Sequence, residues 1–461
     1  MTKSQEHILT TYKLLESNFA KLIPIIPKDR FKSDVNMKLE RIIHLMEVLG
    51  NPQNSFKSIH VGGTSGKGST STLIASILTA QGYKTGLHLS PHLQIINERY
   101  QINSKLVATT KLVEIFERVR PAITQVAQDS LFGQPSYFEA QVALAFCLFE
   151  EQQVDVAIIE VGLGGKLDAT NILLSQVSVL TSVGLDHTDI LGHTVEEIAE
   201  DKACIIKNSQ DVVCGFSQET TKMIVEQHCK QTKSNLWQLG KDFKFSSDND
   251  LLTVNLPNKV YDNLSLKILG NFQFSNAACA VAAAYLFSHG KVSDAAVMQG
   301  LAITSIPGRM ELLQTEPFVI LDGAHNVDKM ESASLTINRL FEDKEKIVVF
   351  ALKKDKPPED ILSYLTVNTK IIVLTKFDDK GLWEPIPPEE LAEITQSIAP
   401  KIPCLVIHDP IEAVKYALSM ADMNDLVWIT GSLYLAGNVR EYWYPSEDLI
   451  IAAEMDTIES T

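Results

Sequence analysis

A glycine-rich segment with a lysine and several hydroxyl side chains could bind the phosphate groups of a nucleotide. Its residues are Gly63, Thr64, Ser65, Gly66, Lys67, Gly68 and Ser69. Glycines let backbone N–H groups close on phosphate oxygens, a lysine adds a mobile positive charge, and the N-terminus of a following helix adds its dipole. The spacing is shorter than in the usual P-loop pattern G-x-x-x-x-G-K-[ST]. The segment therefore predicts a phosphate-binding loop, and an ordinary turn between a strand and a helix is the alternative.

Two further residues could bind a metal ion. Glu160 ends an apolar run that begins at Val156, immediately before a glycine-rich turn. Carboxylates at the carboxyl ends of parallel strands face the ligand crevice, and a hard oxygen ligand suits Mg²⁺. His187 is predicted to end another strand, but imidazole is an unusual ligand for so hard an ion. A solvated carboxylate and a structural histidine are the respective alternatives.

Lys202 lies in a predicted helix. The start of the helix is indicated by Thr194 and Glu197, which have the spacing of a capping box. On this pattern alone, Lys202 would be an exposed lysine on an amphipathic helix.

Two series of short apolar runs alternate with helical patterns, which is typical of parallel βαβ units. Expected strands of the first series are residues 58–61, 85–89, 156–161, 177–183 and 211–216, and those of the second are 318–321, 346–352, 371–376, 405–408 and 426–430. Helices are expected at 69–81, 138–151 and 276–289, and a polar, strand-rich antiparallel excursion at 216–267. The predicted fold is α/β, with a mostly parallel central sheet of P-loop type and a smaller, doubly wound C-terminal domain.

The domain boundary is expected in residues 302–307, where Ser, Pro and Gly interrupt the helical pattern. This predicts an ATP-binding domain at 1–303 and a second domain at 304–461, with a site between them. Arg309 directly follows the linker, so its planar guanidinium could reach phosphates as the domains close. Asp322 ends a predicted strand, where a carboxylate could accept a hydrogen bond from a ribose hydroxyl. The acidic segment after Arg440 is expected to be a helix or a frayed end.

Composition excludes several classes of protein. The net charge of −16 over 461 residues argues against a nucleic-acid partner. The six cysteines have no C-x-x-C spacing, which favours reduced thiols. We find neither a signal peptide nor an apolar run long enough to span a membrane, so we expect a cytoplasmic protein without a membrane partner, and a monomer.

Eight motifs in a fixed order carry a family resemblance. They are the glycine-rich loop, Ser90-Pro-His-Leu93, Tyr137-Phe-Glu139, Glu160-Val-Gly-Leu-Gly-Gly-Lys-Leu-Asp-Ala-Thr-Asn171, Gly184-Leu-Asp-His187, Pro307-Gly-Arg309, Asp322-Gly-Ala-His-Asn326 and Gly431-Ser-Leu-Tyr-Leu435. Together they resemble the folylpolyglutamate synthase and dihydrofolate synthase family of Mur-type ATP-dependent ligases, over roughly residues 35 to 440.

The resemblance implies roles for residues that match the motifs. Ser90 and Glu160 would hold one Mg²⁺, His187 would complete a second Mg²⁺ site, and Lys202, fifteen residues after His187, would be carbamylated. ATP would be bound by Gly63–Ser69, Asn276, Arg309 and Asp322. The residues implied at the substrates are His325 and Ser432 for glutamate, and Ser136, Leu167, Asp168 and Ala169 for the pterin.

The function implied is ATP-dependent addition of L-glutamate to dihydropteroate, to the glutamate tail of reduced folates, or to both. The carboxylate would be activated as an acyl phosphate, with Lys67, His187, Lys202 and Arg309 as catalytic residues. The alternatives are a Mur-type ligase with another carboxylate acceptor, a P-loop NTPase switch, and a nucleotide-binding module without catalysis. A ligase needs all its substrates for turnover, whereas a switch would hydrolyse ATP without them.

Overall fold

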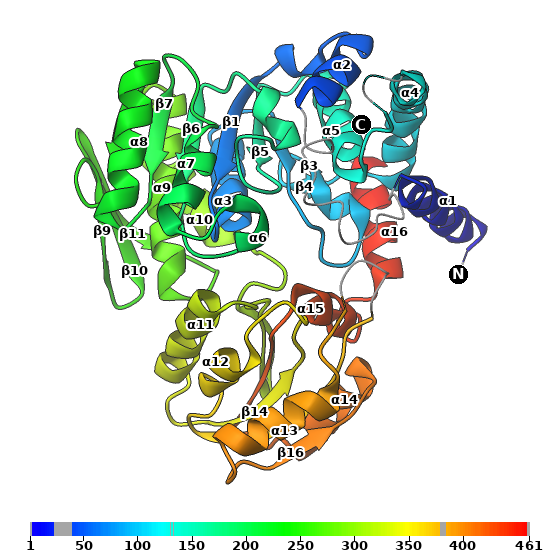
Figure 1. Ribbon diagram of the computed structural model, residues 1–461, viewed down its shortest axis with the longest axis vertical. Helices are drawn as coiled ribbons and strands as arrows, with labels where there is room; N and C mark the ends of the chain where they lie inside the picture. The colour runs from blue at the N-terminus through cyan, green and yellow to red at the C-terminus, as the bar shows by residue number, and fades with distance from the viewer. Residues whose placement is uncertain (1, 23–38, 130, 132, 379–383, 459–461) are drawn as a thin grey trace. The chain divides into compact units, whose positions relative to one another are not determined.

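The computed structural model describes residues 2–22, 39–129, 131, 133–378 and 384–458 (Figure 1). It contains two compact units. Unit 1 comprises Met1–Lys267, Phe274–Thr304 and Glu447–Thr461, and unit 2 comprises Ile268–Gln273 and Ser305–Ser446. The chain therefore returns to unit 1 near its end, a crossing that the linker composition at 302–307 does not indicate.

Unit 1 contains an eight-stranded sheet in the order β4-β3-β2-β5-β1-β6-β7-β8. Its strands are β1 (Lys57–Gly62), β2 (Thr85–His88), β3 (Tyr100–Ile102), β4 (Lys105–Leu106), β5 (Val156–Glu160), β6 (Val177–Leu180), β7 (Asp211–Cys214) and β8 (Asn235–Gln238). β2 and β5 to β8 run parallel to β1, whereas β3 at one edge pairs antiparallel with both β2 and β4. The predicted mostly parallel sheet is confirmed.

The central strands are apolar over their whole length because both faces of the sheet are covered. Every residue of β5 is buried, and β5 lies between β1 and β2. β6 pairs with the other side of β1. Because β2, β5, β1 and β6 are parallel neighbours, the loops that follow them lie at one edge of the sheet, where ligands bind in open α/β folds.

Helices surround this sheet. They are α1 (Lys3–Ala20), α2 (Leu39–Val48), α3 (Lys67–Ala80), α4 (Thr109–Gln128), α5 (Tyr137–Glu151), α6 (Thr188–Leu191), α7 (Val195–Ala203), α8 (Glu219–Thr232), α9 (Asn271–Phe287), α10 (Asp294–Ile303) and α16 (Ser446–Ile458). α3 packs on β1, β2 and β5 and is covered by α10, while α5 packs on β2 and α4. The acidic C-terminal segment forms α16, whose Ile450 and Ala453 are buried. Within the described ranges, no helix is both long and apolar enough to span a membrane.

The segment at 216–267 is only partly as predicted. β9 (Lys244–Asp248), β10 (Leu251–Leu256) and β11 (Lys259–Ser265) form the expected small antiparallel sheet. However, the helix α8 and the strand β8, which pairs parallel with β7, precede it, so the prediction of an antiparallel excursion is wrong for residues 219–238. α8 buries only one narrow stripe, at Thr221, Val225 and Cys229, so its sequence has little of the apolar periodicity that indicates a helix.

Unit 2 contains a six-stranded sheet in the order β12-β13-β17-β14-β15-β16. Its strands are β12 (Glu311–Thr315), β13 (Phe318–Leu321), β14 (Glu345–Phe350), β15 (Thr369–Leu374), β16 (Cys404–Val406) and β17 (Asp425–Thr430), and its helices are α11 (Val327–Leu340), α12 (Pro358–Ser363), α13 (Pro388–Ile398), α14 (Pro410–Met420) and α15 (Leu433–Arg440). All five predicted strands are present. β12, antiparallel at the edge, was not predicted because its sequence Glu-Leu-Leu-Gln-Thr is short and partly exposed.

Candidate active site

The glycine-rich loop connects β1 to α3, and its glycines are required by space as well as by backbone angle. Gly66 caps α3 in the left-handed region at φ +82, and a Cβ added there would lie 2.3 Å from Oδ1 of Asn276. A Cβ on Gly63, at φ +148, would lie 2.0 Å from Oγ1 of Thr181. A side chain at either position would displace the neighbouring polar group, so the loop conformation depends on glycine.

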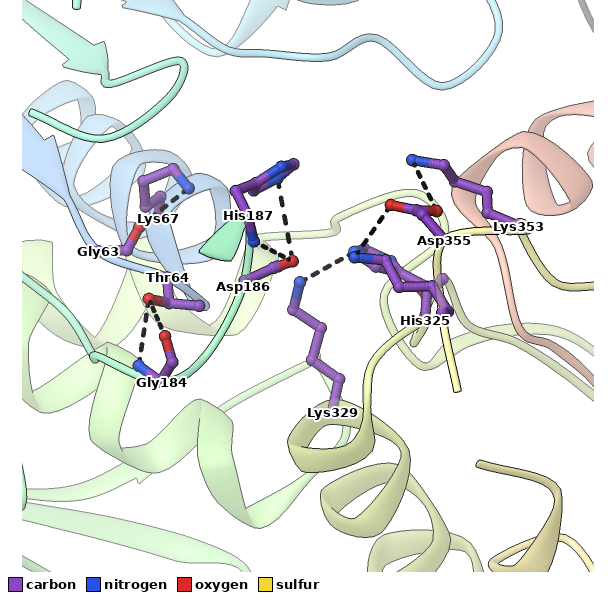
Figure 2. A network of polar contacts seen from close by, with 12 residues as sticks. Gly63, Thr64, Lys67, Gly184, Asp186, His187, His325, Lys329, Lys353 and Asp355 are labelled. Carbon is purple, nitrogen blue, oxygen red and sulfur yellow. Dashed lines mark hydrogen bonds and ion pairs between the residues drawn. The ribbon is translucent and has the colours of Figure 1, made fainter. Parts of the chain in front are cut away.

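The segment after β6 anchors this loop. The backbone N–H of Thr64 donates to the carbonyl of Ser182 at 2.8 Å, and the N–H of Ser65 donates to the Ser182 hydroxyl at 3.0 Å. Figure 2 shows Thr64 contacting Gly184 and Lys67 contacting Gly63. The ammonium of Lys67 donates to the Gly63 carbonyl at 3.1 Å. Lys67 therefore folds back over the loop, where an anion would find both the cation and the start of α3.

Glu160 and Ser90 are joined directly. Glu160 ends β5 and is buried, and its Oε2 accepts the backbone N–H of Ser90 at 2.8 Å. A Cβ on Gly68 would lie 3.5 Å from Glu160 Oε1, so the carboxylate lies against the phosphate loop. The ends of β2, β5 and β1 thus bring these three residues together.

The residues present fit a Mg²⁺ ion that is also bound by phosphate. Glu160 is a buried carboxylate beside a helix N-terminus, and Ser90 adds a hydroxyl oxygen. In the part of the chain that the structure describes, no group of three or more His, Cys, Asp and Glu side chains could hold a metal. Mg²⁺ is commonly held by one or two carboxylates, water and substrate phosphates rather than by an all-protein cage.

His187 does not end a strand, so this part of the prediction is wrong. β6 stops at Leu180, and His187 stands before α6 in the left-handed region at φ +51. The backbone N–H of His187 donates to Oδ1 of Asp186 at 3.1 Å (Figure 2), and 39% of the His187 side chain is exposed. The predicted strand at 177–183 is longer than β6 because Val183 continues the apolar run in the sequence. In the structure, Gly184 belongs to the loop that contacts Thr64.

Lys202 is buried, which excludes an exposed lysine at this position. Only 3% of it is accessible, and α7 packs so closely on the turn after β5 that a Cβ on Gly165 would lie 2.8 Å from the Lys202 Cα. The predicted capping box of α7, Thr194 with Glu197, is confirmed. Burial, together with the charge of Lys67, lowers the pKa of Lys202 to about 7, and Asp201 and two other carboxylates oppose this shift. A large fraction of this amine is therefore neutral near pH 7.

A pocket of about 350 Å³ adjoins these groups within unit 1. All four residues that the family resemblance assigns to the pterin line it, namely Ser136, Leu167, Asp168 and Ala169. Ser90 also lines it, so the residue that binds Glu160 connects the pocket to the phosphate loop. A volume of this order suits a small heterocyclic ligand.

The pocket also contains residues to which the sequence analysis assigns no role at the site. Arg41 on α2 forms a buried ion pair with Glu139 on α5 at 2.7 Å, and Arg99 and Phe138 line the same space. Glu139 also accepts the N–H of Ser136 in a capping box. The Ser136–Glu139 spacing could have indicated that helix start, but nothing in the sequence pairs Glu139 with Arg41.

Unit 2 holds Asp322, His325 and Ser432 in the loops after β13 and β17, and Arg309 just before β12. Asn276 lies on α9 in unit 1, beside Gly66 of the phosphate loop. Asp322 is buried, and its two carboxylate oxygens accept the N–H groups of Met310 at 3.0 Å and Ala324 at 2.7 Å. Burial raises the pKa of Asp322, and the nearby Arg309 opposes this shift. Ser432 caps α15 by accepting the N–H of Tyr434 at 3.1 Å.

His325 lies in the same loop as Asp322. One ring nitrogen is 2.7 Å from the Gly323 carbonyl and the other is 3.1 Å from the ammonium of Lys329 (Figure 2). Lys353, after β14, forms an ion pair with Asp355 at 3.5 Å. This edge of unit 2 therefore carries several cations, which could bind an anionic substrate.

The fold and these groups define a nucleotide-dependent ligase of the Mur type. Residues 61–284 match the Mur ligase middle domain, and residues 308–433 match the Mur ligase glutamate ligase domain. The chain is 32% identical over 430 residues to the dihydrofolate synthase/folylpolyglutamate synthase of Bacillus subtilis, covering 89% of this chain and 96% of that protein. It is also 32% identical to the folylpolyglutamate synthase of Lacticaseibacillus casei, covering 87% and 93%. The chain belongs to the dihydrofolate synthase/folylpolyglutamate synthase family of Mur ligases.

Solved structures agree with this assignment. Mycobacterium tuberculosis folylpolyglutamate synthase complexed with ADP has a TM-score of 0.86 and 27% identity, covering 95% of this chain and 99% of that chain. Escherichia coli FolC in complex with DHPP and ADP has a TM-score of 0.81 and 27% identity, covering 93% and 97%. The resemblance drawn from the eight motifs is confirmed.

Proposed function

We propose that this protein joins the amino group of L-glutamate to the carboxyl group of a pterin-bearing acceptor, with ATP as the energy source. The acceptors are dihydropteroate and the glutamate tail of a reduced folate. One observation carries the proposal: Ser90 lines the pocket and also donates its N–H to Glu160, which lies against the phosphate loop. An acceptor in the pocket can therefore extend its carboxylate to the place where a γ-phosphate would lie.

The related proteins support the same substrates. Relatives are named dihydrofolate synthase/folylpolyglutamate synthase, and structures of related proteins contain ADP, AMPPCP or DHPP. These names match the acceptors and the nucleotide that we propose.

In the proposed reaction, an oxygen of the acceptor carboxylate attacks the γ-phosphorus and ADP leaves, which gives an acyl phosphate. The amine of glutamate then attacks the acyl carbon, inorganic phosphate leaves, and the amine loses a proton. Lys67 and the loop N–H groups from Gly63 to Ser69 stabilise charge on the phosphates. Arg309 binds phosphate through its planar guanidinium, and Asn276 and Asp322 bind the nucleoside.

Mg²⁺ would be held by Glu160 and Ser90, with a second ion at His187, and when bound it would neutralise phosphate charge. Carbamylated Lys202 would place an anion beside that centre, and its buried amine with a pKa of about 7 supports this assignment. His325 and Ser432 would bind the incoming glutamate in unit 2. Ser136, Leu167, Asp168 and Ala169 would bind the pterin ring.

The test is an assay of phosphate release and product mass with the purified protein. ATP, Mg²⁺ and L-glutamate are supplied with dihydropteroate, with tetrahydrofolate, or without an acceptor. We expect one glutamate to be added for each phosphate released, and no turnover when either glutamate or the acceptor is missing. Equal phosphate release without an acceptor would instead show an NTPase switch, and inactivity with both acceptors would point to a ligase with a different carboxylate substrate.

A further inference from the structure

A chain of hydrogen bonds runs from the core of unit 1 to the pocket. His60 lies on β1, and its Nε2 is 2.8 Å from Oγ1 of Thr170. The same Oγ1 is 2.5 Å from Oδ1 of Asp168, which lines the pocket. Neither His60 nor Thr170 is accessible to solvent.

The direction of the donors in this chain follows from proton counting. Burial raises the pKa of Asp168, but the hydrogen bonds from Thr170 and Leu163 oppose this shift. Because both carboxyl oxygens already accept backbone N–H groups, Asp168 acts as the acceptor, and Thr170 donates its single hydroxyl proton to Oδ1. The hydroxyl oxygen then accepts from His60, which places the ring proton on Nε2. Burial lowers the pKa of His60 to about 3, so the imidazole is neutral and its Nδ1 is unprotonated. In keeping with this, the buried Nδ1 has no hydrogen-bond partner among the described residues.

The chain determines how much acceptor capacity Asp168 retains. Oδ1 accepts both the hydroxyl and the backbone N–H of Thr170, the latter at 2.9 Å, so its two lone pairs are occupied. Oδ2 accepts the N–H of Leu163 at 2.8 Å and keeps one lone pair. This oxygen lies next to Gly162, where an added Cβ would be 3.0 Å away, and both residues line the pocket. Asp168 therefore offers one strong acceptor position to a ligand.

We propose that His60 and Thr170 are positioning residues that act through Asp168. They hold its carboxylate in one rotamer, occupy one of its oxygens, and direct the remaining acceptor of the other oxygen at an N–H donor on the heterocycle of the bound substrate. The pocket then discriminates in favour of rings that carry an N–H at that place, such as an aminopyrimidinone, and against rings that carry only acceptors. This inference rests on the proposed function, because it requires the pterin-bearing acceptor to occupy this pocket.

The first experiment removes only the hydroxyl. Thr170→Val keeps the shape of the side chain and should raise KM for dihydropteroate about tenfold, since the carboxylate loses its fixed direction and a buried partner. The kcat value and KM for ATP should stay within about twofold of wild type. Thr170→Ser restores the hydroxyl and should return KM close to wild type. The control is Thr395→Val in α13, because Thr395 is equally buried but its hydroxyl donates only to the Leu391 carbonyl of its own helix.

The second experiment needs no activity. Histidine ¹⁵N spectra should show His60 as a neutral ring with the proton on Nε2, and the signal can be assigned by its absence in His60→Gln. Thr170→Val should shift this signal, while Thr395→Val should not. Thermal unfolding of each variant verifies that it folds.

The outcomes separate the inference from the proposed function. A Thr170→Val protein with a wild-type KM for the acceptor, or a ring proton on Nδ1 of His60, would overturn the inference even if the wild-type protein is an active ligase. A lower kcat together with a higher KM for every substrate would also overturn it, because that pattern indicates general disruption of the fold. If the wild-type protein forms no amide with either acceptor, the proposed function fails, and the tautomer of His60 still decides whether the hydrogen-bond chain exists as described.

Discussion

The chemical state of Lys202 gives the sharpest prediction from this structure. A lysine in water has almost no neutral amine near neutral pH, and only the neutral amine reacts with CO₂. Burial of Lys202 lowers its pKa from 10.5 to about 7. At pH 7.5 this raises the neutral fraction from roughly a thousandth to roughly three quarters. The structure therefore provides the reactive form of the amine at physiological pH.

The neighbours of Lys202 set a condition on the modification. Asp201, Asp186 and Asp168 are near enough to favour the ammonium, so they would repel a carbamate. Lys67 acts in the opposite direction. We therefore expect carbamate to form to a greater extent when Mg²⁺ and ATP are present, because added cationic charge offsets the carboxylates.

The variant that tests this is Lys202→Ala, for which we expect kcat to fall by at least about 100-fold. Excess acetate should restore part of the activity, because it can fill the vacated anion site. Lys207→Ala is the matched control. Lys207 is also a partly buried lysine with a lowered pKa, and its ammonium donates to the Cys204 carbonyl. This control should keep its activity.

The direct assay is ¹³C spectroscopy after exchange with ¹³CO₂. A carbamate signal should appear in the wild type and in Lys207→Ala, be absent from Lys202→Ala, and grow on addition of Mg²⁺ and ATP. At constant dissolved CO₂ the signal should decline as the pH falls below about 7, because the amine then becomes protonated. A bare ammonium at Lys202 in an active enzyme with ATP and Mg²⁺ bound would refute the reasoning, and so would full activity of Lys202→Ala without acetate.

Three other variants test separate parts of the proposed site. Lys67→Ala should lower kcat by about 100-fold or more with an unchanged circular dichroism spectrum, and near-normal turnover would remove Lys67 from phosphate chemistry. Arg309→Lys keeps the charge but loses the planar fork, so kcat/KM should fall by the equivalent of about 1–3 kcal/mol, whereas full activity would contradict a bidentate phosphate contact. Gly162→Ala would place a Cβ 2.4 Å from the Phe138 ring and 3.0 Å from Asp168 Oδ2, so KM for dihydropteroate should rise while KM for ATP stays constant. An unchanged KM for both substrates would show that the acceptor does not use this part of the pocket.

Much of the fold could be predicted because its central strands are short and apolar throughout. β5 and β13 match the predicted strands closely, since strands buried on both faces of a sheet form continuous apolar runs that are easy to recognise in the sequence. The prediction failed where one face is exposed. α8 and β12 have mixed polar sequences, and their positions depend on contacts with distant segments that no local periodicity records.

The candidate site divides in the same way. The loop from Gly63 to Ser69 could be predicted because its constraints are local: Gly66 must adopt a left-handed conformation at a helix start. The burial of Lys202 could not, because it depends on the close approach of α7 to Gly165, a residue on a different loop. Sequence alone gives an ordinary amphipathic helix there, and only the family motif suggested an unusual lysine.

The hydrogen-bond chain shows what a sequence motif can leave out. Asp168 and Thr170 are two residues apart, and a side-chain-to-backbone contact between them follows from local turn chemistry. His60 enters the chain from β1, more than a hundred residues away, only because β1 is adjacent to β5 and the turn after β5 folds back over it. A histidine in a buried strand has no evident role until its partner is known. Since the partner is a hydroxyl that already donates to a carboxylate, the three residues act as one acceptor group, and a change in His60 should be measurable at the pocket.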